Sequence, residues 1–319
     1  MITMANSSPG IQSRKKDHVE AVIRQDVSHR KATGFELVDF EHNALPEIDY
    51  GEIDTSTMFL GHKLKAPLMV TGMTGGYPDA EAINRDIAAA CEAEGVAFGL
   101  GSQRAMVEKP ELTKTYAVRK VAPKTLLVAN IGGYQLKKIP IDKIRKMADD
   151  VGADALAIHL NPSQEAVQQG GDVDWKGVLP AIENACRKRC KPIIVKECGV
   201  GISAQVAKKL ESAGVSAIDV SGAGGTSWVA VELARGGRNA GEAFWDWGIP
   251  TAVALQQCRQ STKLPLVASG GIRNGLEVAK AIRLGATVVG GAAPFIKAQR
   301  AGGTKAVRDE IKLWVEQLK

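Results

Sequence analysis

Short apolar segments rich in β-branched residues recur along the chain, and alanine-rich stretches of helical period lie between most of them. Eight of these segments, each ending in glycine or a polar residue, are expected to be strands: 66–71, 96–100, 125–130, 155–159, 192–196, 217–221, 265–269 and 286–290. The helical periodicity predicts amphipathic helices at 80–94, 141–151, 179–189, 203–213 and 276–284. This alternation is typical of a parallel sheet buried on both faces.

The number of strand–helix units favours a closed α/β fold, the (β/α)8 TIM barrel. The barrel is expected over residues 66–319, within a single domain that spans 1–319. A doubly wound open sheet is the alternative. It is weakened because no G-x-G-x-x-G motif opens the first helix.

Two segments depart from the repeat. An N-terminal extension, 1–65, has a helical pattern up to His29 and a strand-like stretch at 35–40. Its basic pair, Arg14 and Lys15, leads into that helical pattern and is expected to fold over a site.

A long loop, 222–250, follows the sixth expected strand. Loops of this length in compact domains are usually functional or disordered, and aromatic content favours packing over disorder. Trp228 and the aromatic cluster 244–247 are therefore the candidates for a lid.

Composition and charge narrow the class of protein without deciding it. Apolar residues make up 45% and charged residues 24%, which is ordinary for a globular protein. The net charge of +6 suits anionic ligands, whereas no zinc-ligand spacing or RNP-like aromatic pattern supports nucleic-acid binding. The five cysteines show no framework spacing, so free thiols in a reducing cytoplasm are expected. The N-terminus has no secretory signal pattern, and no apolar run is long enough for a membrane helix.

Polar residues and glycines gather where the expected strands end, and barrel enzymes place their sites at that rim. The turns concerned are 71–76, 99–104, 130–133, 159–165, 196–201, 221–228, 269–273 and 290–293. Glycine-rich turns after the last two strands commonly hold a phosphate through backbone N–H groups. Arg273 adds charge there, and Thr226 adds a hydroxyl donor.

Lys196 ends the fifth expected strand. A lysine inside a barrel mouth is costly to bury unless it meets an anion. It could form a Schiff base, face an electron-rich cofactor ring or make a structural ion pair. The glycine-lined turns around it favour the ring.

His159 and Asn161 share one face at period two, and Gln164 and Glu165 follow in the loop. One carboxylate is too few for an all-protein metal cage. It suits Mg²⁺, which takes further ligands from water and from substrate phosphates. No set of His and Cys has zinc spacing.

Together these motifs resemble those of the type 2, FMN-dependent isopentenyl-diphosphate delta-isomerases, from about residue 13 to the C-terminus. Arg-Lys-x-Asp-His at 14–18 and His-x-Asn-x-x-Gln-Glu at 159–165 are the most specific segments. The other matching segments are 73–76, 102–104, Asn130, 196–197, 221–226, 269–273 and 291–293.

The resemblance implies a role for each group of residues. The flavin would be lined by Met73, Thr74, Gly75, Ser102, Asn130, Lys196, Ser221 and Thr226. Its phosphate would be held by Gly270, Gly271, Arg273, Gly291 and Ala292. The diphosphate substrate would contact Arg14, Lys15, Ser102, Gln103, Arg104, His159, Asn161 and Gln164. Glu165 would hold Mg²⁺, and the residues that act in catalysis would be Gln164, His159 and Lys196.

The implied reaction converts isopentenyl to dimethylallyl diphosphate without net redox change. One proton is added at one carbon and another is removed two carbons away. An alkene is a poor base, so a well-placed acid is required. The resemblance implies that reduced FMN supplies and retrieves the protons, that NADPH keeps it reduced, and that the protein is a cytoplasmic homotetramer or octamer.

Two other interpretations stay open at this point. A flavin oxidoreductase of the 2-hydroxy-acid oxidase type shares the Gly-Gly-x-Arg turn, but it needs a histidine base after a late strand. The last histidine here is His159, at the fourth expected strand. The other is a phosphate-binding barrel without activity, which the complete set of motifs disfavours.

Overall fold

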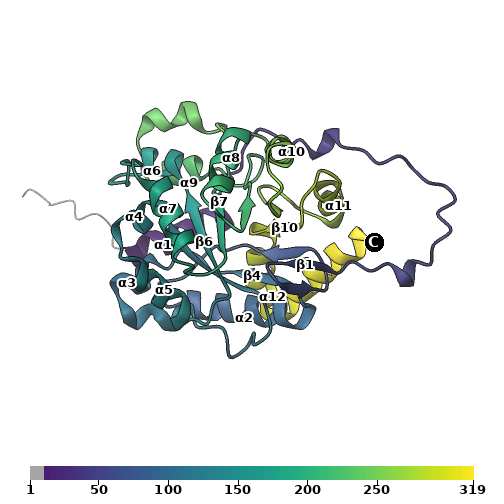
Figure 1. Ribbon diagram of the computed structural model, residues 1–319, viewed down its shortest axis with the longest axis horizontal. Coiled ribbons are helices and arrows are strands. Elements are labelled where there is room, and N and C mark those ends of the chain that lie inside the picture. Colours follow the sequence, from purple (N-terminus) through teal and green to yellow (C-terminus); the bar gives the residue numbers. More distant parts are fainter. Residues whose placement is uncertain (1–10) are drawn as a thin grey trace, which may run out of the picture.

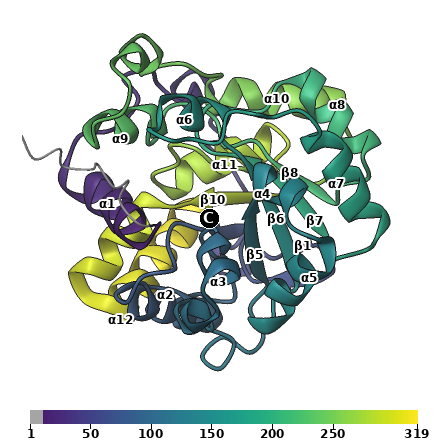
Figure 2. The same cartoon turned by 90° about the vertical axis from the view of Figure 1, so that its left-hand side faces the viewer.

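The computed structural model describes residues 11–319, with side chains from Lys15 onward. It contains a closed barrel of parallel strands in the order β10-β3-β4-β5-β6-β7-β8-β9. The strands are β3 (Leu68–Val70), β4 (Ala97–Gly99), β5 (Leu127–Gly132), β6 (Ala155–Leu160), β7 (Ile193–Glu197), β8 (Ala217–Asp219), β9 (Leu266–Ala268) and β10 (Val288–Gly291). Figure 2 shows the helices arranged around these strands. The predicted TIM barrel and its strands are confirmed.

The helices that cover the barrel include the predicted ones. They are α2 (Ala80–Glu94), α3 (Arg104–Glu108), α4 (Gly133–Lys138), α5 (Ile141–Asp150), α6 (Pro162–Val167), α7 (Val178–Arg187), α8 (Ala204–Ser212), α9 (Trp228–Ala234), α10 (Thr251–Ser261), α11 (Gly275–Arg283) and α12 (Ala293–Leu318). Short 3-10 turns lie at η3 (Pro110–Thr115) and η4 (Asn239–Phe244). Ser203 caps the N-terminus of α8, and its side chain accepts a hydrogen bond from the Val206 backbone.

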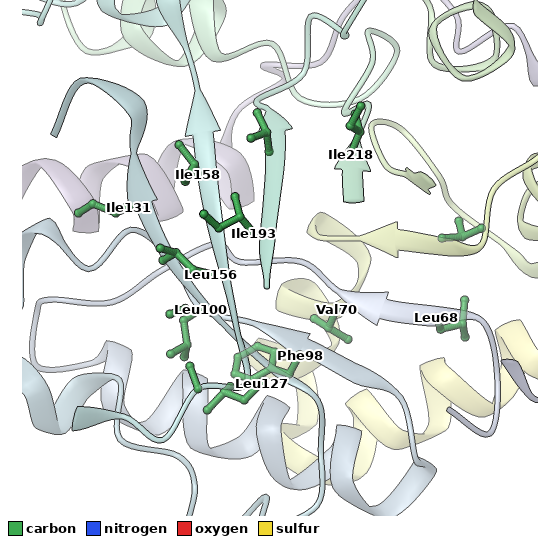
Figure 3. Close-up of a cluster of buried hydrophobic side chains, with 14 of the residues drawn as sticks. Leu68, Val70, Phe98, Leu100, Leu127, Ile131, Leu156, Ile158, Ile193 and Ile218 are labelled. Carbon is green, nitrogen blue, oxygen red and sulfur yellow. The ribbon is translucent and has the colours of Figure 1, made fainter. Parts of the chain in front are cut away.

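Alternation along the strands produces two apolar layers. Outward side chains such as Phe98, Leu156 and Ile193 pack against the helices in one buried cluster (Figure 3). Inward side chains such as Val128 and Ile194 form a second cluster inside the barrel. A hairpin of β1 (Thr57–Phe59) and β2 (His62–Leu64) adds Phe59 and Leu64 to this inner cluster. The inner cluster fills the barrel beneath the site.

The N-terminal extension differs in part from the prediction. The helix α1 (Ile11–Arg24) ends five residues before His29. The expected strand at 35–40 is wrong, because Phe35–Leu37 form the 3-10 turn η1. Gly34, with φ of +87°, turns the chain there, and a closed barrel leaves no free edge for another strand.

An arm, residues 38–56, runs away from the barrel on the side of α11 and the C-terminus (Figure 1). It includes the 3-10 turn η2 (Tyr50–Glu52). Its large apolar side chains are exposed, at 73% for Leu45 and 67% for Ile48. Its links to the body include hydrogen bonds from the Tyr50 hydroxyl to the Glu316 carbonyl, at 3.1 Å, and from the Thr55 hydroxyl to the Lys65 carbonyl, at 2.8 Å.

No helix within residues 11–319 has both the length and the apolar character that a bilayer crossing requires. All five cysteines carry free thiols.

Candidate active site

A cavity of about 570 Å³ opens at the carboxyl ends of the barrel strands, where sites in this fold lie. Most of the residues predicted for the site line it. They are Lys15, Met73, Thr74, Ser102, Arg104, Asn130, His159, Asn161, Gln164, Glu165, Lys196, Ser221, Thr226, Gly270, Gly271, Arg273, Gly291 and Ala292. Segments far apart in the sequence therefore meet in one place.

Two predicted residues do not line the cavity, and one falls outside the described side chains. The Gln103 side chain is fully buried, and its carbonyl accepts a hydrogen bond from the Asn130 backbone at 3.0 Å. In this structure the Gln103 side chain does not line the cavity, and its contact with the substrate stays a prediction. Gly75, with φ of +153°, packs against the Tyr116 ring. The side chain of Arg14 lies outside the described residues.

Between the cavity and the inner apolar cluster lies a layer of inward positions, most of them polar. Each barrel strand contributes one inward position, two residues beyond a member of that cluster. The positions are Thr71, Gly99, Asn130, His159, Lys196, Asp219, Ser269 and Gly290. Strand register places His159, Lys196 and Asp219 side by side on β6, β7 and β8.

Glycines make a cradle where the turns after β8 and β9 meet. A Cβ on Gly225 would lie 2.5 Å from the Gly271 nitrogen, and one on Gly271 would lie 2.6 Å from the Gly224 carbonyl carbon. Gly271 also has φ of +79°, which L side chains rarely adopt. Only glycine allows this approach. The Arg273 guanidinium reaches the Gly224 carbonyl at 3.3 Å, so a cation flanks the cradle.

Backbone strain accompanies the cradle at Ser221. This residue has φ of +38°, in the left-handed region that is uncommon outside glycine. Its carbonyl accepts hydrogen bonds from the backbones of Gly199 and Gly201, at 2.9 and 3.0 Å. The loop after β7 thus holds the strained turn after β8 in place.

Lys196 is buried among groups that favour its charge. Its ammonium donates to the Glu197 carbonyl at 2.5 Å and lies 3.9 Å from the Cys198 sulfur. Burial disfavours the cation, but Cys198, Asp219 and Glu197 outweigh this and hold its pKa above the ordinary value. Lys196 is therefore a cation at neutral pH, suited to an anionic or electron-rich ligand.

His159 is held as a neutral ring. Burial, together with the nearby Lys196 and Lys15 cations, lowers its pKa to about 3. Its Nδ1 lies 2.8 Å from the Asn130 side-chain oxygen. Because that oxygen can only accept, Nδ1 carries the proton and Nε2 is an acceptor in this state.

Gln164 belongs to a buried network that the sequence analysis missed. Its amide nitrogen donates to Glu232 at 2.8 Å, and its carbonyl accepts from Asn161 at 3.1 Å. The same Glu232 oxygen lies 2.9 Å from His18 Nε2, and Arg235 donates to the other oxygen at 2.7 Å. Although burial favours the neutral acid, the hydrogen bonds and charges from His18, Gln164 and Arg235 hold the pKa of Glu232 below its ordinary value.

The N-terminal segment closes one wall of the cavity. Lys15 donates to the Ser102 carbonyl and, at 2.7 Å, to the Tyr116 hydroxyl. Farther along, Ser28 forms a β-bridge with Thr226. Lys15 thus lies in the wall of the cavity, and its contact with a substrate stays a prediction.

The predicted lid aromatics separate into two groups. Trp228 lines the cavity, and its ring lies edge-on to His18 at 5.3 Å between centroids. Phe244 and Trp247 pack against each other and stay exposed, at 47% and 62%, without lining the cavity. They lie in the loop outside the site, so of this group Trp228 alone can cover a ligand.

Glu165 and Arg104 are joined through Asp172. The Asp172 backbone donates to Glu165 at 2.8 Å, and its carboxylate accepts from Arg104 at 3.0 Å. Glu165 is the acid that lines the cavity near Asn161. Within residues 15–319 no group of three or more His, Cys, Asp or Glu side chains is arranged to hold a metal ion. Any cation here needs ligands from a bound phosphate and from water.

Relatives of the chain are similar over nearly its whole length. It is 46% identical to an isopentenyl-diphosphate delta-isomerase of Pyrococcus furiosus, over 96% of this chain and 81% of the relative. It is 51% identical to that of Vibrio parahaemolyticus, over 90% of this chain and 87% of the relative. The chain belongs to the isopentenyl-diphosphate delta-isomerase family.

Within that family, the match to a flavin-dependent family identifies the type 2 class. The model of the FMN-dependent dehydrogenase family matches residues 145–319, more than half of this isomerase-family chain. Solved structures with the same fold include the flavin-binding domain of baker's yeast flavocytochrome b2, with a TM-score of 0.69 and 21% identity over 95% of this chain and 77% of that one. A lactate oxidase of Pediococcus acidilactici has a TM-score of 0.66 and 16% identity over 96% of this chain and 87% of that one. At such identities the likeness concerns the fold alone.

Proposed function

We propose that this protein converts isopentenyl diphosphate into dimethylallyl diphosphate with reduced FMN and Mg²⁺. The observation that carries the proposal is one cavity that gathers the glycine cradle, the Lys196 cation and the substrate-side residues Lys15, Arg104 and Asn161. The names of the relatives point to the same reaction. FMN and Mg²⁺ are supported by the chemistry of the residues that line the cavity.

The residues present fit the flavin. Gly225 and Gly271 let the two turns approach each other at the cavity, where any Cβ would collide with backbone, and their N–H groups would hold the FMN phosphate beside Arg273. Lys196 would meet the ring, since its pKa keeps it cationic. When bound, reduced FMN supplies a proton donor and acceptor next to the alkene.

The residues present also fit Mg²⁺. One protein carboxylate would be a ligand of the ion, and oxygens of the substrate would complete its coordination shell. Glu165 would hold the ion, and its hydrogen bonds from Asn161 at 3.1 Å and from the Asp172 backbone at 2.8 Å orient the carboxylate. Lys15 and Arg104 would bind and orient the diphosphate. These charge-assisted contacts place the hydrocarbon end of the substrate without reacting themselves.

Gln164 would sit beside the reacting carbons, held by Asn161 and Glu232. Its fixed amide dipole, backed by the ionised Glu232, would favour positive charge on the substrate as the alkene gains a proton. Trp228 would exclude water and protect that cationic transition state from capture. NADPH as the reductant rests on the family resemblance.

A homo-oligomer is part of the proposal, and the arm supports it. Residues 36–54 contain seven carboxylates and no Lys or Arg, which leaves +13 on the rest of a chain whose total charge is +6. An acidic arm with exposed Leu45 and Ile48 suits the basic body of a second copy. In multi-angle light scattering, L45S/I48S should lower the mass of the assembly, whereas L313S on α12 should not. An unchanged mass for L45S/I48S would remove the arm from the interface.

The experiment that tests the activity is an anaerobic incubation. The chain loaded with FMN is mixed with Mg²⁺, NADPH and isopentenyl diphosphate, and the dimethylallyl isomer is followed by NMR. Product should form only when the flavin is reduced. Absence of product with FMN bound, or turnover of a 2-hydroxy acid instead, would refute the proposal.

A further inference from the structure

Asp219 is a buried carboxylate that none of the steps above uses. It is 1% exposed, on β8, and its backbone is the register partner of Lys196 on β7. Ser269 donates to one of its oxygens at 2.6 Å, and the Ser221 backbone donates to the same oxygen at 3.2 Å. The other oxygen, Oδ2, has no hydrogen-bond partner within the described residues. Leaving a buried carboxylate oxygen unsatisfied is costly, so this oxygen needs an explanation.

A second, small cavity lies beside Asp219. Its volume is about 20 Å³, and Lys196, Asp219, Asn130 and Thr71 contribute its polar lining. Much of the remaining lining comes from the inner apolar cluster, including Val128 and Ile194. A cavity of roughly 10–15 Å³ or more can hold one water if it has polar partners. Size and lining therefore suit a single water.

Lys196 and Asp219 are neighbours on adjacent strands. The ion pairs within 4.0 Å among residues 15–319 do not include Lys196. Both side chains nonetheless line the same small cavity, one strand apart. A water there can accept from the ammonium and donate to Asp219 Oδ2, which satisfies both groups.

We infer that Asp219 positions the Lys196 ammonium through one buried water on the side away from the flavin. Asp219 thereby tunes the positive electrostatic potential that Lys196 produces at the flavin ring. This inference rests on the proposed flavin site. Asp219 is a positioning residue in this scheme, since it touches neither the flavin nor the substrate. Its negative charge partly offsets Lys196, so Asp219 disfavours the anionic reduced flavin and keeps the reduction potential lower than Lys196 alone would.

The test is the reduction potential of bound FMN in D219N. Loss of the negative charge should shift the equilibrium toward reduced flavin by about tenfold, which is about 30 mV for a two-electron couple. FMN affinity should change far less. D154N is the matched control, because Asp154 likewise accepts hydrogen bonds, from Arg119 and the Leu127 backbone, but does not line either cavity. A potential that D219N leaves unchanged would overturn the inference.

Two further measurements keep the result interpretable. In a K196M background the D219N shift should become smaller, since the part that acts through the position of Lys196 is lost, and a shift as large as in the wild-type background would overturn the inference. A high-resolution crystal structure of the wild-type protein should show a water between Asp219 Oδ2 and Lys196 Nζ, and a dry cavity would overturn it without any variant. Failure of the wild-type chain to bind FMN would instead refute the proposed function.

Discussion

Replacing Glu232 with glutamine tests the network that holds Gln164 and His18. The E232Q amide can accept through one oxygen, but its NH₂ group would face His18 or Arg235, which are hydrogen-bonded to the carboxylate at 2.9 and 2.7 Å. Removing one partner from a buried charge pair typically costs about 3–5 kcal/mol. Glu232 and Arg235 are such a buried pair, since their side chains are 2% and 13% exposed. We therefore expect E232Q to lower the free energy of unfolding by about 3 kcal/mol.

The same change should lower kcat more than it lowers flavin binding. Gln164 would lose the carboxylate that accepts its N–H at 2.8 Å, and with it a fixed orientation toward the substrate. A loss of about 100-fold in kcat corresponds to 2.7 kcal/mol of transition-state stabilisation, within the range for one preorganised polar group. FMN affinity should stay within about threefold, since Glu232 does not line the cavity.

Urea unfolding and steady-state kinetics measure the two effects. The control is E94Q, which removes a partly exposed ion pair with Arg308 at 2.8 Å on the outside of the barrel. That pair should contribute less than about 1 kcal/mol, and kcat should not change. If E232Q were as stable and as active as E94Q, the network would have no part in holding the site.

Further changes probe the cradle, the diphosphate contacts and the neutral histidine. G271A should weaken FMN binding at least about 100-fold in a fluorescence titration, because its Cβ would lie 2.6 Å from the Gly224 carbonyl carbon; unaltered affinity would contradict the cradle. K15A should raise KM for isopentenyl diphosphate by about 10- to 100-fold and change kcat little, as expected for a ground-state phosphate contact; a purely kcat effect would refute that role. The pKa of His159 in the folded protein is about 3, below that of the unfolded chain. Because the unfolded chain therefore binds a proton that the folded protein does not, His159 should lower the free energy of unfolding by about 1.4 kcal/mol per pH unit as the pH falls from about 6.5 toward 4. H159Q should lose that part of the slope in urea titrations, and an identical slope would show that His159 is protonated in the fold.

Much of the fold could be predicted from the sequence because parallel strands buried on both faces read as continuous apolar runs. The α2 helix, Ala80–Glu94, matches its predicted range because Gly95 ends it in the left-handed conformation. The hairpin at Thr57–Phe59 and His62–Leu64 was missed, since each strand has three residues and too little alternation to recognise. The strand predicted at 35–40 was wrong for a related reason. Local alternation of apolar and polar residues does not show whether a sheet has a free edge where another strand could pair.

The site residues that lie at the ends of barrel strands could be predicted from the sequence. The alternation of side chains along each strand is enough to place three of them, Lys196, His159 and Asn130, on the inside of the barrel. The buried orientation of Gln103 could not be predicted, because a turn motif does not say which way a side chain points. Glu232 was missed because it lies on α9, within the segment 222–250 that was expected to be a loop, and its partners His18 and Gln164 come from distant segments. Only the closed fold brings these three together.

The central claim is that one cavity holds the flavin and the diphosphate in contact. A crystal structure of the chain with FMN, Mg²⁺ and isopentenyl diphosphate tests it most directly. We predict the flavin phosphate at Gly271 and Arg273, the ring against Lys196, and the diphosphate on Lys15 and Glu165-bound Mg²⁺. Density for the diphosphate outside this cavity, or for the flavin phosphate away from the glycine cradle, would contradict the account.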